Sequence, residues 1–316
     1  MAGSGDSTRA ILFALGANFA IAVAKGVAAF FTGSSAMLAE TVHSLADCGN
    51  QLLLLLGMRQ AKRPASADYP LGYGKAIYFW SFLVALMLFS VGGMFSLYEG
   101  YHKLHDPEPL KQWWWAVGVL IFGIVAESVS MRACLQEVNK ARAGRSLWRW
   151  FRESRQAELV VIFGEDLAAL FGLVFALIAV VLAVVTGNPV WDAIGTLAIG
   201  VLLIVVAVFV AVEVKALLIG QSVDKDVQAS IRAFLEAEPQ VRHVISLITL
   251  QLGNEMMVSV QAEMLERPSS TALIEDINAI EARMKAKFPM VRWSFFEPEV
   301  ALASGGTDQD YLAPAG

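Results

Sequence analysis

The chain contains six apolar stretches, and each is long enough to cross a lipid bilayer as one helix. About 20 such residues suffice, and hydropathy places the stretches at residues 10–31, 34–58, 76–101, 113–136, 158–186 and 190–218. A mean hydropathy of +0.56 and a charged fraction of 17% exclude an ordinary soluble domain. The sequence therefore predicts a polytopic α-helical membrane protein with six transmembrane helices.

The second stretch carries its polar residues on one face. Glu40, His43, Asp47 and Asn50 follow one another at intervals of three, four and three residues, which matches about 3.6 residues per helical turn. An ionisable residue in hydrocarbon costs about 2.5–3.5 kcal/mol, so this face must contact protein, water or a bound ion. His43 and Asp47 offer the imidazole and carboxylate ligands that zinc and its neighbours prefer. A polar seam that joins helices by hydrogen bonds is the alternative.

Further charged residues lie inside or beside the other stretches. Glu127 is expected to be paired, protonated or on an ion route. Glu165 and Asp166 are adjacent, so their side chains diverge by about 100° and only one of them can face a given site. Lys25 is expected to pair with an acid on a neighbouring helix, which the sequence does not identify. Asp192 is interpreted as a capping or interfacial residue rather than a ligand.

Basic residues of the short loops gather on one side of the predicted membrane domain. The connections after the second and fourth stretches carry nine of them, whereas the other side carries two. Basic loops stay in the cytoplasm, so we expect both termini on the cytoplasmic side, or on the equivalent side of an organelle membrane. The membrane that we expect is the bacterial cytoplasmic (inner) membrane. Trp148 and Trp150 are predicted to mark the inner interface. The nine are Arg59, Lys62, Arg63, Lys140, Arg142, Arg145, Arg149, Arg152 and Arg155, and the two are Lys103 and Lys111.

The segment after Gly220 has the composition of a soluble domain. Its pattern predicts a helix over 224–238, two strands over 241–253 and 255–265 joined at Gly253-Asn254, a helix over 269–288 and a strand over 290–299. This order is typical of a compact α+β fold. The predicted domains are an N-terminal tail (1–9), the membrane domain (10–220), the α+β domain (221–299) and a disordered tail (300–316).

Several motifs in a fixed order resemble one family of membrane proteins. These motifs are His43-Ser44-Leu45-Ala46-Asp47 with Asn50, Tyr69-Pro70-Leu71-Gly72-Tyr73-Gly74-Lys75, Asp166, Asp192, Gly220-Gln221-Ser222 and Phe296-Glu297-Pro298. In their order and spacing, over about residues 10–299, the chain resembles the cation diffusion facilitator family of divalent metal transporters. It resembles more closely the zinc transporter nine-like branch of that family, which has a Glu-Asp pair on the fifth helix.

The resemblance implies a fold, a mechanism and a set of ligands. It implies a six-helix membrane domain, a ferredoxin-like cytoplasmic dimerisation domain, and a tetrahedral site between helices 2 and 5 that exports zinc in exchange for protons. The metal residues carried over are His43, Asp47 and Asp166. The family's fourth ligand falls on Ile162, which cannot ligate, so Glu165, Glu127 or water must replace it, and Glu165 is preferred.

The resemblance also sets the expected partners and excludes others. Zinc(II) is expected as cargo rather than cofactor, with manganese, iron(II), cobalt or cadmium as alternatives. The expected partners are the lipid bilayer, the metal ion, protons and a second copy of the chain, and no basic run suggests nucleic acid. In the soluble domain only Glu297 is a candidate ligand, so we expect a homodimer with little or no metal there.

Two other classes of protein are alternatives to a transporter. A membrane metal sensor that binds without transporting is the alternative function. An enzyme is not expected, because the chain contains no His-Glu-x-x-His motif of a metalloprotease.

Overall fold

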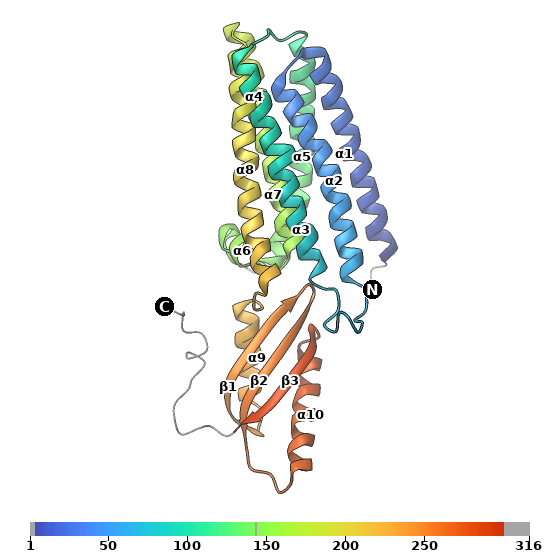
Figure 1. Cartoon of the computed structure of the whole chain (residues 1–316), viewed down its shortest axis with the longest axis vertical. Helices are drawn as coiled ribbons and strands as arrows, with labels where there is room; N and C mark the ends of the chain where they lie inside the picture. The colour runs from blue at the N-terminus through green and yellow to red at the C-terminus, as the bar shows by residue number, and fades with distance from the viewer. Residues whose placement is uncertain (1–3, 143, 300–316) are drawn as a thin grey trace. The chain divides into compact units, whose positions relative to one another are not determined.

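The computed structural model describes residues 4–142 and 144–299, apart from the side chains of residues 4–14 and 17. The chain divides into two compact units, which we describe separately (Figure 1). The first unit consists of Met1–Arg59, Ile77–Arg152 and Ala157–Lys215, and the second of Gln60–Ala76, Glu153–Gln156 and Ala216–Gly316. The predicted disordered tail, 300–316, lies outside the described residues.

The first unit is a bundle of long helices. Each predicted stretch coincides with one of them, and the third is a continuous helix, Ala76–His105, whose middle part η1 is a π-helix. Helix α1 begins at Ser4, inside the segment predicted as a tail. The helices are α1 (Ser4–Thr32), α2 (Ser35–Ala61), α3 (Ala76–Met87), η1 (Leu88–Met94), α4 (Phe95–His105), α5 (Trp113–Ala141), α6 (Leu147–Glu153), α7 (Ala157–Thr186) and α8 (Val190–Ile219).

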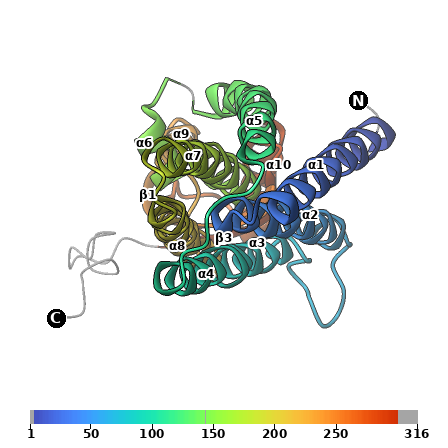
Figure 2. The same cartoon turned by 90° about the horizontal axis from the view of Figure 1, so that it is seen from above.

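Within the described residues, four helices are long and apolar enough by themselves to cross a membrane. They are Ala76–His105, α5, α7 and α8. The described apolar part of α1, Asn18–Thr32, is shorter. Helix α2 has the required length but carries a polar face, of which Glu40, His43 and Asn50 are buried and Asp47 is partly exposed. Seen along the bundle, α2 lies beside α1 and α3 (Figure 2). The polar helix is therefore shielded by its more apolar neighbours.

Glycines let the third membrane helix pack closely on α8. A Cβ added at Gly93 would lie 2.5 Å from Ile204, and one at Gly100 would lie 2.9 Å from Leu197. From the other side, a Cβ at Gly200 would lie 2.9 Å from Leu97. Membrane helices associate through such close packing of small residues, since lipid is as apolar as their side chains. This pair is therefore held at a separation that larger residues would prevent.

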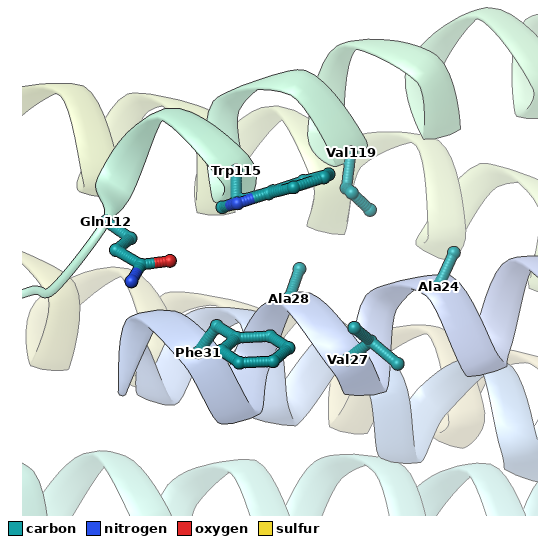
Figure 3. Close-up of a pocket in the computed structure, with 7 residues that line it drawn as sticks. All are labelled: Ala24, Val27, Ala28, Phe31, Gln112, Trp115 and Val119. Carbon is teal, nitrogen blue, oxygen red and sulfur yellow. The ribbon is translucent and has the colours of Figure 1, made fainter.

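Between α1 and α5 an apolar groove opens on the bundle. Figure 3 shows Trp115 projecting into it from α5 and Phe31 from α1, with Ala24 and Ala28 leaving space. No charged side chain lines the groove, so it is not a candidate site for an ion. Its lining consists of Ala24, Val27, Ala28, Phe31, Gln112, Trp115 and Val119.

The short helix α6 was not predicted, and it corrects one expectation from the sequence. Trp148 is exposed and packs edge-on against Phe209 of α8, whereas Trp150 is buried against Phe163 of α7. Only one of the two tryptophans is therefore positioned for an interface. Arg152 of α6 pairs with Glu213 of α8 at 2.9 Å. The basic loop thus contains a helix that packs on α7 and α8.

Asp192, in the first turn of α8, caps another helix. It is fully buried, and its Oδ1 accepts a hydrogen bond from Ser34 Oγ at 2.6 Å. Its Oδ2 accepts from the backbone N–H of Ser35 at 2.7 Å and from Ser35 Oγ at 2.9 Å. These donors lie at the N-terminus of α2, where backbone N–H groups lack helical partners. The predicted capping role is confirmed, but the helix that Asp192 caps is α2 rather than its own.

The second unit is the predicted α+β fold. Its elements are α9 (Lys225–Glu236), β1 (Val241–Leu252), β2 (Glu255–Met264), α10 (Ser270–Lys287) and β3 (Val291–Glu299). Strand β2 pairs antiparallel with β1 and parallel with β3. Residues of α9 and α10 share one hydrophobic core with one face of this sheet. The other face carries Ile248 and Phe295, which are more than half exposed.

Two segments that follow α2 and α6 belong to the second unit. Gly74 lies against the β1–β2 turn, where a Cβ would collide with the backbone carbonyl of Leu252. Gly253, at that turn, has a φ of +68°, and a Cβ added there would lie 2.8 Å from the backbone oxygen of Gly74. Arg155 donates a hydrogen bond to the backbone oxygen of Ser222 at 2.7 Å. The second unit is therefore assembled from three separate parts of the sequence.

The cap on α2 gives a prediction for stability. Asp192→Ala should lower the free energy of unfolding by about 2–4 kcal/mol, because three buried donors lose their charged acceptor. A denaturant titration of the detergent-solubilised protein measures this. Asp106→Ala, which removes an exposed aspartate from a loop, is the matched control and should have little effect. Equal effects of the two substitutions would contradict the capping role.

Candidate functional site

Polar side chains from four helices meet inside the first unit. Helix α2 contributes the face that the sequence singled out, and α1, α5 and α7 contribute Lys25, Glu127 and the Glu165-Asp166 pair. Glu40, His43 and Asn50 are fully buried. Buried polar groups normally have hydrogen-bond partners, so each partner, and each unpaired atom, carries information about the site.

His43 and Asp47 face the same space. The ring of His43 is fully buried, and its Nε2 lies 3.6 Å from Asp47 Oδ2. Both ring nitrogens of His43 and the Oδ1 of Asp47 are buried with no hydrogen-bond partner among the described residues. A Cβ added at Gly92 of η1 would lie 3.9 Å from His43 Nδ1, so the ring lies against the π-helical segment. Unpaired donors and acceptors of this kind are expected where a ligand binds.

Glu165 joins α7 to α2. Its Oε1 accepts a hydrogen bond from Asn50 Nδ2 at 2.5 Å, and its side chain is buried. Glu165 also lies close enough to Asp47 for the two carboxylates to interact electrostatically. The first acid of the pair on α7 therefore faces α2.

Asp166 faces a different neighbour, as its position next to Glu165 predicts. Ser130 of α5 donates a hydrogen bond to Asp166 Oδ2 at 3.3 Å. Glu127, one turn before Ser130, interacts electrostatically with Asp166 and with Asp47. The acids of α5 and α7 therefore lie near the carboxylate of Asp47, and the positive charge of Lys25 acts on both Glu127 and Asp47.

The structure gives Lys25 the partner that the sequence could not identify. Its Nζ donates hydrogen bonds to Glu40 Oε2 at 3.1 Å and to Ser44 Oγ at 2.7 Å. Both side chains of the ion pair are fully buried. In the sequence, only the opposite charges in neighbouring apolar stretches pointed to a pairing of Lys25 with Glu40. No pattern there pointed to Ser44, to Ser130 or to Gly92.

The predicted metal residues are brought into one region but do not form a closed ligand shell. Over residues 4–142 and 144–299, no group of three or more His, Cys, Asp and Glu side chains is close enough to hold a metal ion. His43 and Asp47 form a pair, while Glu165 and Asp166 bond to Asn50 and Ser130. Ile162, at the family's fourth position, is 38% exposed. The ligand set of His43, Asp47, Asp166 and Glu165 stays a prediction.

Comparison with known proteins identifies the family. A bundle of membrane helices with buried acids and a buried histidine, some of whose polar atoms have no hydrogen-bond partner among the described residues, defines a polytopic membrane protein with a polar intramembrane site. Residues 11–219 match the family described as the cation efflux transmembrane domain. The chain belongs to this family, the cation diffusion facilitators.

The relatives are longer than the matched region. The "Proton-coupled zinc antiporter SLC30A9, mitochondrial" of Xenopus laevis is 34% identical over 231 residues, which are 72% of this chain and 41% of the relative. Its human counterpart is 32% identical over the same shares. "Metal tolerance protein C4" of Arabidopsis thaliana is 31% identical over 237 residues, which are 74% of this chain and 52% of the relative. The chain thus spans about half or less of the length of these relatives.

The hydrogen bond between α2 and α7 gives a second prediction. Asn50→Ala should lower the free energy of unfolding by about 1–3 kcal/mol, because it leaves the buried carboxylate of Glu165 without its donor. Equilibrium unfolding in detergent checks the value. Gln51→Ala removes an amide from the next position of the same helix, where Oε1 has no partner among the described residues, and should cost less. The reverse order would contradict the role given to Asn50.

Proposed function

We propose that this protein exports a divalent transition-metal ion, zinc first, across a membrane in exchange for protons. The observation that carries the proposal is the largely buried His43–Asp47 pair. Its two ring nitrogens and Asp47 Oδ1 have no hydrogen-bond partners among the described residues, and the acids of α5 and α7 lie near its carboxylate. The names of the SLC30A9 relatives support both the ion and the coupling. No covalent chemistry is required, and we propose no enzymatic activity.

The proposed exchange follows from the protonation that each ligand needs. His43 binds a metal only as neutral imidazole, and Asp47, Asp166 and Glu165 bind it only as carboxylates, so arrival of the metal releases protons. When the metal leaves on the other side, protons return to the same groups. Rocking of helices around a fixed site would expose it to each side in turn. Assembly of the full ligand shell would require Asp166 to turn from Ser130 of α5 towards α2.

The types of the proposed ligands favour zinc, but they do not select zinc alone. One imidazole and two or three carboxylates suit zinc, and they also suit manganese, iron(II), cobalt and cadmium. With Ile162 in the fourth position the site has no second imidazole. We therefore propose zinc as the main cargo of a site whose selectivity is broader than that of a histidine-rich site.

The direction of transport rests on the predicted orientation of the membrane domain. We propose that both termini and the second unit lie on the side from which the metal enters, since basic loops remain on that side. The bacterial cytoplasmic membrane stays a prediction, and the SLC30A9 relatives are named as mitochondrial.

Loss of a ligand tests the transport function. In sealed vesicles with an imposed pH gradient, Asp47→Ala and Asp166→Ala should each reduce zinc flux by about tenfold or more, because residues that only orient a ligand already cost that much. Glu137→Ala, which removes an exposed acid from α5, should transport like the unchanged protein. Full flux in both ligand variants would refute the assignment.

We also propose a homodimer formed through the open face of the sheet. Three rows of residues cross this face, and the middle row carries two apolar side chains, Ile248 and Phe295, that are more than half exposed. The apolar side chains of the third row are half-buried. Exposed apolar patches of this kind mark interaction sites. The rows are Ser246–Gln261–Glu297, Ile248–Ser259–Phe295 and Leu250–Met257–Trp293.

The proposed dimer does not depend on a metal of its own. Glu297, the candidate ligand in this domain, accepts a hydrogen bond from Gln261 Nε2 at 2.9 Å. An amide therefore occupies the position beside the carboxylate. This supports dimerisation with little or no metal in the second unit.

A charge in the middle row tests the dimer. Phe295→Asp should convert a dimer to a monomer in light scattering after size-exclusion chromatography, because it buries a carboxylate in the interface. Ile274→Asp, at a site on α10 that is 56% exposed, is the matched control and should leave the mass unchanged. A Phe295→Asp variant with the mass of the unchanged protein would exclude this face.

A further inference from the structure

Lys25 is a buried cation that the proposed exchange does not use. Its side chain is fully buried in a helix that contributes none of the predicted metal ligands. Placing an ammonium group away from water is costly unless acceptors surround it. Glu40 and Ser44 provide these acceptors at 3.1 Å and 2.7 Å. The sequence therefore retains a charge where an apolar residue would suffice for packing alone.

The two partners of Lys25 lie on either side of His43 along α2. Glu40 precedes the histidine by three residues, and Ser44 follows it directly. Glu40 and Ser44 are one turn apart, as are His43 and Asp47, so the two pairs lie on adjacent strips of the same helix. Holding the first strip against α1 fixes the rotation of α2 about its axis, and with it the direction of the second strip.

The surroundings leave this arrangement little freedom. On α7, a Cβ added at Gly172 would collide with Glu40 Oε1, so the carboxylate fits only against a glycine. On α5, a Cβ added at Gly123 would lie 3.7 Å from Lys25 Cε. The ion pair is thus enclosed by the same helices that carry Glu127, Glu165 and Asp166.

We propose that Lys25 is a positioning residue of the cation site. Its hydrogen bonds to Glu40 and Ser44 hold α2 at the rotation that presents His43 and Asp47 to α7. The inference rests on the proposed function and deepens it. Lys25 does not touch the cargo, because its own positive charge repels a dication. Its ion pair engages Oε2 of Glu40, whereas Oε1 of Glu40 is buried with no hydrogen-bond partner among the described residues.

A comparison of four variants separates positioning from a purely structural role. Replacing both partners of a buried ion pair with apolar residues is often neutral or stabilising, and it leaves the net charge of the site unchanged. The double variant Lys25→Met/Glu40→Met should therefore fold. We expect its affinity for Zn²⁺ to fall 10–100-fold, because α2 has lost the contact that orients its ligands. Ser44→Ala should act in the same direction with a smaller change, and Lys25→Arg should recover part of the affinity lost in Lys25→Met.

The measurements use the full chain in detergent. Isothermal titration with Zn²⁺ gives the affinity, the visible absorption of bound Co²⁺ reports the ligand geometry, and thermal unfolding reports the fold. The matched control is Lys140→Met/Glu137→Met, which removes an exposed ion pair from α5 whose Nζ and Oε1 lie 2.6 Å apart. It should change neither the affinity, nor the absorption spectrum, nor the unfolding temperature.

The outcomes distinguish the inference from the proposed function. A folded double variant with unchanged Zn²⁺ affinity and Co²⁺ spectrum would overturn the inference. If the double variant does not fold, Ser44→Ala, which keeps the ion pair, decides: unchanged affinity overturns the inference and reduced affinity supports it. Zn²⁺ binding without flux in the unchanged protein would refute transport alone. An unchanged protein that binds no Zn²⁺ would overturn both.

Discussion

The polar face of α2 sets the main constraint on this fold. Its buried acids, histidine and asparagine cannot face lipid, so the other helices must supply partners for them. They do so at successive levels along the helix. Asp192 of α8 caps its first residues, Lys25 of α1 pairs with Glu40, and Glu165 of α7 bonds to Asn50. The bundle is organised by these few polar contacts, and apolar packing fills the space between them.

Between two of these anchors lies the His43–Asp47 pair, whose ring nitrogens and Oδ1 have no hydrogen-bond partners among the described residues. His43 and Asp47 follow Glu40 and precede Asn50 on the same face, and η1 lies against the imidazole. π-Helical segments are frequent at functional sites, because they disturb the regular packing of a helix. The contacts on both sides hold the pair in place, and the helix that packs against it is irregular.

The sequence predicted the elements much better than the contacts. Hydropathy located all six long helices, and alternation located the strands and helices of the second unit, because both signals are local. The partner of Lys25 could not be predicted, since it depends on which of several acids lies nearest in space. The same holds for Ser130, which bonds to Asp166. Trp150 was assigned to the interface from its neighbours, yet tertiary packing buries it against Phe163. The candidate ligands came from spacing and resemblance, and their mutual geometry came only from the fold.

The three-part construction of the second unit affects how the protein can be divided. The turn at Gly253 packs against Gly74, which is more than 170 residues earlier in the chain, and Ser222 is bonded by Arg155. A fragment expressed from Ala216 onwards would lose both contacts and expose the backbone that they cover. Conversely, a protease cut within 60–76 would loosen the sheet domain while leaving its strands intact. Truncation experiments on this chain therefore remove part of the second unit's own structure, even when they leave its strands complete.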